Sequence, residues 1–402
     1  MRMKYPYKSI LILNVFLTLM FVISCEDKKP DEIETVLDWK NLNLAEDWQT
    51  GKINVEGIDT ESLEKGINHV KSFSGFYSMA IVYKGRMVVE DYKNGNKNSK
   101  YPVWSVTKSV LSALVGIAID KGMIADEYQK LDSYYPNVAD SLKGEITIAQ
   151  LLTMSSGITD DITYLAAAYP LQFILEKDLL YPSGTYWNYT SAGTHVLSYI
   201  FTAGTEQSAK TFGDTHLFSK LGISDYSWSQ DAYGISNGGF GLDLKLRDMA
   251  KFGQLFLQNG QSDGNEIISS SWVNKSTEMI VPFDASQSWG YGYLWWTAKV
   301  NGVNIYNALG YAGSEVAWRV NWQIRMKVNL SSWNMSPGCC EITPWAIPTF
   351  ANFRSGCRRN TRGCAVRNAS PCCMTWWAIP ARAGPMWHGR TLKKTCRSAP
   401  QG

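Results

Sequence analysis

SVTKSVLSALVGIAIDK, residues 105–121, is a strongly apolar and regular stretch of this 402-residue chain. Its aliphatic side chains recur at helical spacing and Gly122 follows, so we predict a buried helix that ends there. Ser105 and Lys108 stand three residues apart at its start, and residues at that spacing share one face of a helix. Lys108 is the one charge on this stretch before Asp120, so its burial requires a polar partner.

Ser105 and Lys108 together have the chemistry of a nucleophile and its base. A serine hydroxyl is a weak nucleophile until a neighbouring group takes its proton, and an amine desolvated in a core can do so near neutral pH. The free N–H groups at the start of a helix also favour negative charge close to Ser105. The S-x-x-K pattern alone is weak evidence for catalysis, because a serine that caps a helix and is followed by a solvated lysine has the same sequence.

Two later stretches strengthen the hypothesis. Tyr186–Gly193 (YWNYTSAG) precedes an apolar helical pattern, and a tyrosine on such a loop can transfer protons if a nearby cation lowers its pKa. Gly310–Ser314 (GYAGS) has the small residues that let a substrate carbonyl approach the backbone, on what we expect to be an edge strand. There the N–H of Ser314 would join that of Ser105 as an oxyanion hole. Taken singly, the first stretch also fits a packing aromatic and the second a glycine bend.

The order and spacing of these motifs resemble those of serine β-lactamases, penicillin-binding proteins and their esterase and amidase relatives. The resemblance rests on Ser105-x-x-Lys108, Tyr189-x-Ser191 and Tyr311-Ala312-Gly313, and covers about residues 60–318. Residues 146–158 (ITIAQLLTMSSGI) also resemble the segment between the first two motifs of that family. The 84 residues between Ser105 and Tyr189 are similar to the spacing in the class C branch.

The resemblance implies an α+β fold, in which an antiparallel sheet is flanked by helices and a mostly helical subdomain is inserted. It also implies roles for individual residues. Ser105 would attack a carbonyl and become acylated, and Lys108 would deprotonate it or hold Tyr189 as a phenolate. Tyr189 would relay the proton to the leaving group, and the N–H of Ser314 would help to stabilise the oxyanion. Neither a cofactor nor a metal is implied.

Two positions depart from the antibiotic-hydrolysing branch of the family. In that branch the second motif ends in Asn, whereas in this chain it ends in Ser191. The third motif of that branch begins with Lys, whereas in this chain it begins with Tyr311, two residues before Gly313. That lysine would bind a substrate carboxylate. Its replacement favours a small ester, amide or peptide-like substrate, as in the esterases and the 6-aminohexanoate-dimer hydrolase group. The alternatives are a β-lactamase or D-alanyl-D-alanine carboxypeptidase, and a non-catalytic penicillin-binding sensor or inactive relative.

Further elements fit an α+β plan in which both ends of the body supply strands. Residues 78–92 predict two strands around a Lys84-Gly85 turn, and Thr147 with Gln150 predicts a capping box at the start of a helix. Another amphipathic helix is expected over residues 246–259. Residues 289–296 and 303–308 predict strands joined by a turn at residues 301–302.

The N-terminus predicts export. A basic start is followed by an apolar run over residues 9–24 and then by Cys25. This resembles a bacterial lipoprotein signal, which implies lipidation of Cys25, a lipid anchor in the membrane and a place in the cell envelope. An uncleaved anchor helix is the alternative. We therefore expect residues 1–25 to be a signal peptide, 26–40 a linker and 41–320 the hydrolase domain.

The last part of the chain, residues 321–402, differs in composition from the rest. It holds twelve lysines and arginines, one acidic residue (Glu341) and seven of the eight cysteines. Our hypothesis is that this tail is frameshifted or foreign sequence that replaces the native end. Because the excess of basic residues lies in it and not in the body, we expect no nucleic-acid partner.

Other catalytic patterns fit less well. Gly234–Gly238 (GISNG) matches a G-x-S-x-G nucleophile elbow, but Ser229–Tyr233 before it is not an apolar strand and the one later histidine, His388, lies in the tail. The remaining histidines are scattered, and no C-x-x-C or H-E-x-x-H spacing occurs, so no metal site is expected.

Overall fold

A computed structural model describes residues 37–53, 59–73, 76–137, 141–300, 303–311 and 315–319. The predicted signal peptide, most of the linker and the whole of the tail lie outside these residues. Within them, no helix is both long enough and apolar enough to cross a bilayer.

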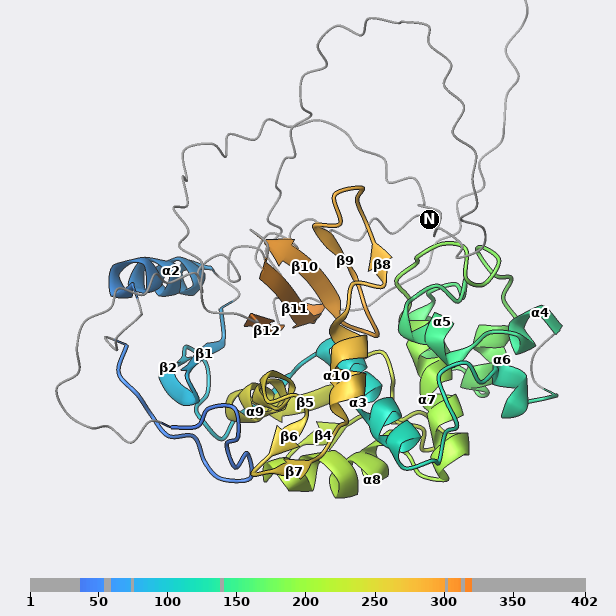
Figure 1. Ribbon diagram of the computed structural model, residues 1–402. Coiled ribbons are helices and arrows are strands. Elements are labelled where there is room, and N and C mark those ends of the chain that lie inside the picture. Colours follow the sequence, from blue (N-terminus) through green and yellow to red (C-terminus); the bar gives the residue numbers. More distant parts are fainter. Residues whose placement is uncertain are drawn as a thin grey trace, which may run out of the picture.

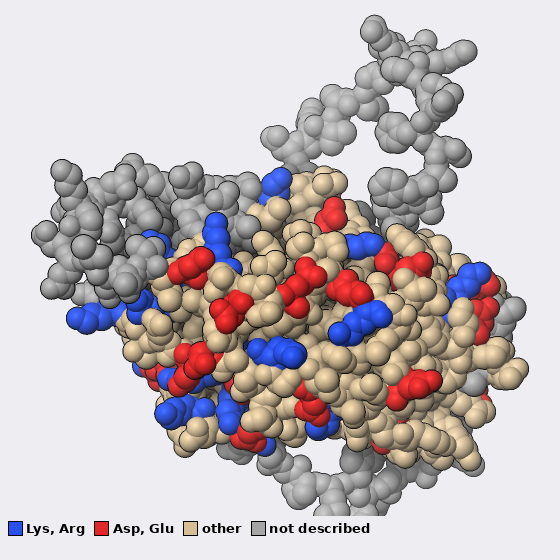
Figure 2. All heavy atoms as spheres, turned by 60° about the horizontal axis from the view of Figure 1, so that its bottom comes forward, with Lys and Arg blue, Asp and Glu red and all other residues tan. Residues whose placement is uncertain are grey.

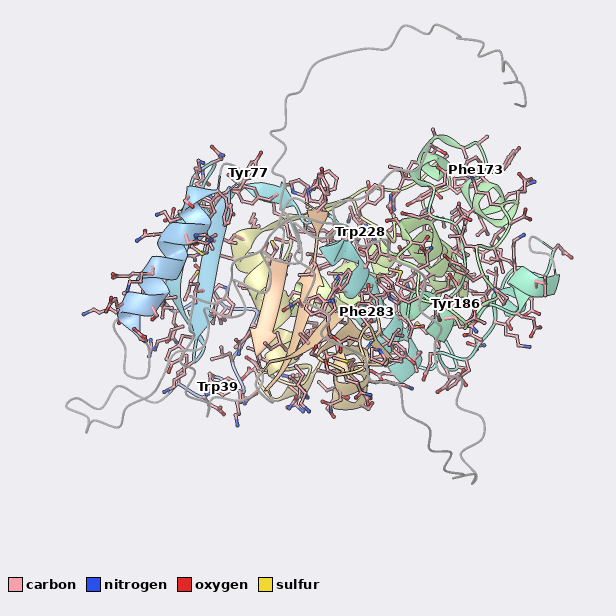
Figure 3. All side chains as sticks on the ribbon, turned by 90° about the horizontal axis from the view of Figure 1, so that it is seen from above. Trp39, Tyr77, Phe173, Tyr186, Trp228 and Phe283 are labelled. Carbon is pink, nitrogen blue, oxygen red and sulfur yellow. The ribbon has the colours of Figure 1, made fainter. Side chains whose placement is uncertain are left out.

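The largest sheet has five antiparallel strands in the order β12-β11-β10-β9-β8. In Figure 1 this sheet lies between helix α2 with hairpin β1–β2 on one side and a group of helices on the other, and Figure 3 shows the same order from above. Its strands are β8 (Val281–Pro282), β9 (Trp289–Tyr291), β10 (Trp296–Val300), β11 (Val303–Leu309) and β12 (Glu315–Arg319). The expected α+β class is confirmed.

Smaller sheets complete the strand inventory of the described residues. The hairpin of β1 (Ser78–Tyr83) and β2 (Arg86–Tyr92) turns at Lys84 and Gly85, both at positive φ, as predicted. The others are β3 (Lys100–Pro102), β5 (Leu242–Lys245) and β4 (Ser227–Trp228), in the order β3-β5-β4, and the pair β6 (Gln261–Ser262) and β7 (Asn265–Glu266).

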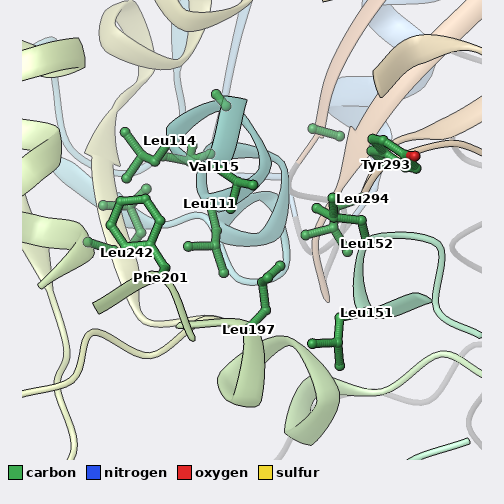
Figure 4. Packing of buried hydrophobic residues seen from close by; sticks show 14 of the residues in the cluster. Leu111, Leu114, Val115, Leu151, Leu152, Leu197, Phe201, Leu242, Tyr293 and Leu294 are labelled. Carbon is green, nitrogen blue, oxygen red and sulfur yellow. The ribbon is translucent and has the colours of Figure 1, made fainter. Parts of the chain in front are cut away.

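Helix α3 (Val106–Asp120) is the centre of the core. Its residues from Val106 to Ala118 are all buried, so it is apolar almost all round, as the sequence predicts for a fully enclosed helix. Figure 4 shows its Leu111, Leu114 and Val115 packed among side chains from α7 (Ser191–Thr205), from α5 (Ile148–Leu152), from β5 and from the turn between β9 and β10. The enclosure fixes the position of the first turn of α3.

The helical group lies between α3 and β5 in sequence and forms the inserted subdomain. Thr147 and Gln150 form the predicted capping box at the start of α5. The predicted helix at residues 246–259 is α9 (Leu246–Leu257). The remaining helices are α2 (Thr60–Ser72), α4 (Ser141–Gly144), α6 (Pro170–Leu175), α8 (Ala209–Gly213), α10 (Ser270–Thr277), and short turns at Leu131–Ser133, Ile162–Ala166, Asp214–Phe218 and Ser219–Leu221.

One strand prediction was wrong in its bounds. The run 289–296 is two strands, β9 and the start of β10, and not one. The chain reverses between them because the N–H of Gly292 bonds to Trp295 O and Leu294 takes a φ of 61°. A side chain at Gly292 would lie 2.3 Å from the carbonyl oxygen of Ser276, so the turn needs glycine.

The surface opposite the sheet carries charges of both signs. Figure 2 shows lysines and arginines interspersed with acidic residues on the face turned forward, without a patch of one sign. This face of the described body therefore has no basic stripe of the kind that nucleic-acid binding requires.

Candidate active site

Ser105 lies at the N-terminus of α3, where the helix begins against the sheet. It is the N-cap residue, but its side chain makes no capping hydrogen bond. The preceding residue, Trp104, has a φ of 50°, a strained conformation for a residue with a side chain, and its carbonyl accepts hydrogen bonds from the backbone and hydroxyl of Thr107. This tight turn leaves the hydroxyl of Ser105 available to another partner.

That partner is Lys108. Its Nζ lies 3.1 Å from Ser105 Oγ, 3.1 Å from Ser191 Oγ and 2.7 Å from the carbonyl oxygen of Gly239. The side chain is 1% exposed. The predicted pairing of Ser105 with Lys108 is therefore present in the structure, and the amine is enclosed rather than solvated.

Burial changes the protonation of this amine. Loss of solvent lowers the pKa of Lys108 to about 7, and the carboxylate of Asp160 opposes the shift. At neutral pH a large fraction of the amine is therefore unprotonated. A neutral amine has two N–H donors and one lone pair, so Gly239 O and Ser191 Oγ can take the donors while the lone pair accepts the proton of Ser105.

Tyr189 and Ser191 come from the loop that leads into α7. The Nζ of Lys108 lies 4.7 Å from the centre of the Tyr189 ring, which in turn stacks on Trp296 at 5.8 Å. Ser191 is the first residue of α7, after Thr190 as N-cap. The second predicted motif thus lies beside the first, although 84 residues separate them in the sequence. Figure 3 shows Tyr186, the first residue of this stretch, on the side of the helices, and Phe283 on the side of the sheet.

Asp160 is a site residue that the sequence did not reveal. Its Oδ1 accepts hydrogen bonds from the N–H of Ser191 at 2.7 Å and of Ala192 at 3.2 Å, and from the hydroxyl of Thr190 at 3.4 Å. A carboxylate at the N-terminus of a 15-residue helix is well placed to satisfy its free N–H groups. The sequence carries no local signal for this contact, because Asp160 lies 31 residues before Ser191.

Gly239 is the second group that the sequence did not reveal, because its contribution is a backbone carbonyl. The segment Gly234–Gly238 before it is not a nucleophile elbow. Ser236 is fully buried, and its Oγ accepts the N–H of Lys210. The sequence prediction that this serine is not the nucleophile therefore agrees with its place in the core.

The third motif is described in part. Tyr311 follows β11 and is exposed, and its ring meets that of Trp104 edge-on, with centroids 5.5 Å apart. The end of β11 thus lies beside the residue that precedes the nucleophile, as the resemblance implied. Gly313 and Ser314, and hence the second oxyanion N–H, lie outside the described residues, as does Cys25.

No cluster of three or more histidine, cysteine or acidic side chains suited to a metal occurs among the described residues. The site brings together the partly exposed hydroxyl of Ser105, a buried amine able to lose its proton near neutral pH, and the ring of Tyr189. Such a set is suited to nucleophilic attack on a carbonyl without a cofactor.

The fold and this site define a serine hydrolase. The model of the beta-lactamase family matches residues 68–326, about two thirds of the chain. The chain belongs to that family.

Individual relatives fall in the same group. The chain is 25% identical over 287 residues to the 6-aminohexanoate-dimer hydrolase of Paenarthrobacter ureafaciens, an alignment that covers 63% of this chain and 72% of the relative. A Bacillus anthracis structure provisionally assigned as a 6-aminohexanoate-dimer hydrolase superposes with a TM-score of 0.55 at 19% identity, covering 75% of this chain and 84% of the other. The octameric penicillin-binding protein homologue of Pyrococcus abyssi gives 0.54 at 16% identity, covering 65% and 71%.

Proposed function

We propose that the protein hydrolyses a small ester or amide that needs no carboxylate for binding, through an acyl-enzyme on Ser105. The observation that carries the proposal is the enclosed amine of Lys108, 3.1 Å from Ser105 Oγ and with a pKa of about 7. In its neutral form this amine takes the proton of Ser105 as the oxygen attacks the substrate carbonyl.

The acyl transfer then proceeds in two halves. The bond from Ser105 Oγ to the carbonyl carbon forms, and the bond from that carbon to the leaving oxygen or nitrogen breaks. The proton held by Lys108 passes to the leaving group, with Tyr189 as the proposed relay beside the amine. Water then attacks the acyl carbon, gives up its proton by the same route, and releases the acid while Ser105 regains its hydrogen.

A substrate that needs no carboxylate for binding is supported by the charges around the site. Asp160 is the charged side chain whose field acts on Lys108, and Tyr311 stands where the antibiotic-hydrolysing relatives carry lysine. The described residues near Ser105 therefore offer aromatic rings, from Trp104 and Tyr311, rather than a fixed cation for a carboxylate. The relative named as a 6-aminohexanoate-dimer hydrolase supports a short amide as one candidate substrate.

The direct test is labelling with a fluorophosphonate together with p-nitrophenyl acetate kinetics. We expect one labelled serine, Ser105, and a burst of p-nitrophenol equal to the enzyme concentration. Ser105→Ala should abolish both. Ser236→Ala is the matched control, because Ser236 is the serine of the competing motif, and it should keep the label on Ser105. A label on any other serine contradicts the proposal.

The substrate class has a separate test in Tyr311→Lys. A lysine there restores a positive charge for a carboxylate, so hydrolysis of carboxylate-bearing esters should improve about tenfold relative to neutral esters, as one charge-assisted contact provides.

A fluorescent penicillin separates the proposed esterase or amidase from a β-lactamase and from a non-catalytic sensor. Rapid turnover by the unmodified protein would favour a β-lactamase, and a stable adduct without turnover of any ester would favour a sensor.

We also propose that Cys25 carries a lipid that anchors the protein in the cell envelope. The apolar run over residues 9–24 before Cys25 supports this. Expression with a radiolabelled fatty acid, compared between the unmodified chain and Cys25→Ser, tests it. The label and the membrane fraction should both be lost in the variant, and a labelled Cys25→Ser protein would refute the proposal.

A further inference from the structure

A buried polar cluster outside the reacting groups lies one turn further along α7. His195 follows Ser191 by four residues, so the two share one face of the helix. The side chains of His195 and Asp231 are both fully buried, and His195 Nε2 lies 3.2 Å from Asp231 Oδ2. Buried groups of this kind are costly unless they are satisfied, and the acyl-transfer steps use neither of them.

The loop of residues 236–239 lies along this face of α7. Ser198 Oγ donates to the carbonyl of Ser236 at 2.6 Å. At the other end, a side chain on Gly239 would lie 2.8 Å from Cβ of Ser191. A side chain on Gly238 would lie 2.1 Å from the carbonyl oxygen of Thr194. Both glycines are therefore required by the close approach of the loop to the helix.

His195 connects this loop to Asp231. The N–H of Gly238 donates to His195 Nδ1 at 3.4 Å, so Nδ1 is unprotonated and Nε2 carries the hydrogen that is donated to Asp231. The Asp231 carboxylate also accepts the hydroxyl of Tyr199 at 2.5 Å and the N–H groups of Tyr233 and Ile235. Burial alone raises the pKa of Asp231, but these hydrogen bonds bring it below its ordinary value.

The same loop is held from a second side by Asn237. Its Oδ1 accepts the N–H of Gly239 at 2.9 Å and the hydroxyl of Tyr164 at 3.1 Å. The Tyr164 ring stacks on His195 with centroids 4.7 Å apart. Tyr164, Tyr199 and Asp231 are thus the titratable groups that face His195, and none of them contacts Ser105.

The loop that His195 and Asn237 hold contacts Lys108 through one atom, the carbonyl oxygen of Gly239. The carbonyl oxygen of Gly239 is its shortest hydrogen-bond partner, at 2.7 Å. With one N–H held there and the other on Ser191, the lone pair of the neutral amine is directed at Ser105. If the Gly239 carbonyl moved, the amine could rotate about its terminal bond and the lone pair would lose that direction.

We propose that His195 and Asp231 are positioning residues that hold the backbone of Gly238 and Gly239 in place, so that the Gly239 carbonyl meets Lys108. The pair fixes the tautomer of the imidazole, the imidazole accepts the N–H of Gly238, and Asn237 accepts the N–H of Gly239. Together these two contacts place the Gly239 carbonyl, which lies in the next peptide unit, beside the amine. This inference rests on the proposed function, since it assigns a role within the activation of Ser105.

Three variants separate this role from a general contribution to stability. Asp231→Asn keeps the volume but offers an amide N–H to His195 Nε2, which drives the imidazole hydrogen to Nδ1, where it opposes Gly238 N–H. His195→Leu removes both contacts. His195→Asn restores an acceptor near the position of Nδ1 without restoring the bond to Asp231.

We expect Asp231→Asn and His195→Leu to lower kcat for p-nitrophenyl acetate about tenfold, with KM unchanged, because the amine is misdirected rather than removed. The acid limb of the kcat profile should also move to lower pH, since the ammonium loses its shortest acceptor. His195→Asn should recover most of kcat. The double variant Asp231→Asn/His195→Leu should be no worse than the poorer single variant.

The readouts distinguish the ways in which the inference could fail. If the unmodified protein shows no burst and no label on Ser105, the proposed function itself is wrong. If it does, and Asp231→Asn keeps the kcat and the acid limb of the unmodified protein, the positioning role is wrong. Because Asp231→Asn is nearly isosteric, it decides the question even if His195→Leu does not fold. Equal losses in His195→Leu and His195→Asn would also contradict the inference.

Discussion

Two buried lysines, Lys108 on α3 and Lys251 on α9, differ in what their amines face. Lys251 is 6% exposed, and its Nζ donates to the carbonyls of Leu221 at 3.0 Å and Ala45 at 3.4 Å. Lys108 is buried still more deeply, and two of its three partners are hydroxyls. A peptide carbonyl has no proton to give to an amine, whereas a serine hydroxyl does.

The charges around the two lysines differ in the same sense. Burial lowers the pKa of both. Around Lys251 the carboxylates of Asp248, Asp47 and Glu46 oppose the shift and favour the ammonium. In the described part of the chain, Asp160 is the one carboxylate that acts in this way on Lys108. Burial alone therefore does not make a lysine a catalytic base. Lys108 is suited to that role because two of its partners are hydroxyls and because little negative charge nearby favours its ammonium form.

The largest expected effect comes from removing each amine in turn. Lys108→Ala should slow acylation of Ser105 by p-nitrophenyl acetate about 10²- to 10⁴-fold, the range that a general base contributes. Lys251→Ala should leave the rate per folded molecule within about threefold of the unmodified protein, because Lys251 contacts no reacting group. Stopped-flow burst rates measure both, and equal losses would remove the distinction drawn between the two lysines.

The second effect concerns stability and runs the other way. Lys251→Ala leaves the carbonyls of Leu221 and Ala45 without the amine that donates to them, and it removes one of the cations that offset the burial of Asp248. We expect the free energy of unfolding at neutral pH to fall by about 1–3 kcal/mol, as for buried hydrogen-bonding groups that lose a partner. Urea denaturation followed by tryptophan fluorescence measures this. Lys251→Met, which keeps the volume, is the control for the lost packing, and a variant as stable as the unmodified protein would show that the Lys251 amine contributes nothing.

A smaller effect is expected from Asp160→Asn. The amide still accepts the N–H of Ser191, but the negative charge that favours the ammonium of Lys108 is gone. The pKa of Lys108 should therefore fall further, and the acid limb of the acylation rate should move to lower pH by less than about one unit, as for an exchange of one nearby charge. Rates measured across the acid range test this, and a shift to higher pH would contradict the assigned role of Asp160.

The sequence predicted those parts that depend on local pattern. The apolar run of α3, the Lys84-Gly85 turn and the Thr147–Gln150 capping box are each written within a few residues, and each is present. The pairing of Ser105 with Lys108 was predictable for the same reason, because three residues on a helix fix the geometry.

The parts that could not be predicted depend on contacts through space. Nothing near Asp160 in the sequence shows that it meets the start of α7, and nothing near Gly239 shows that its carbonyl meets Lys108. The division of residues 289–296 into two strands likewise follows from the carbonyl of Ser276 against Gly292, a contact between distant segments. Such groups act through backbone atoms or helix ends, which leave no motif.

The role of Lys108 as a neutral base at physiological pH is tested by the rate at which a fluorophosphonate labels Ser105 across a range of pH values. Because the neutral amine is the active form, the rate should rise with pH through a midpoint of about 7 and then level off. Lys108→Ala should show a low rate without that inflection. A labelling rate that does not change with pH, or one that rises only near the ordinary lysine pKa of about 10, would show that Lys108 is not the neutral base that activates Ser105.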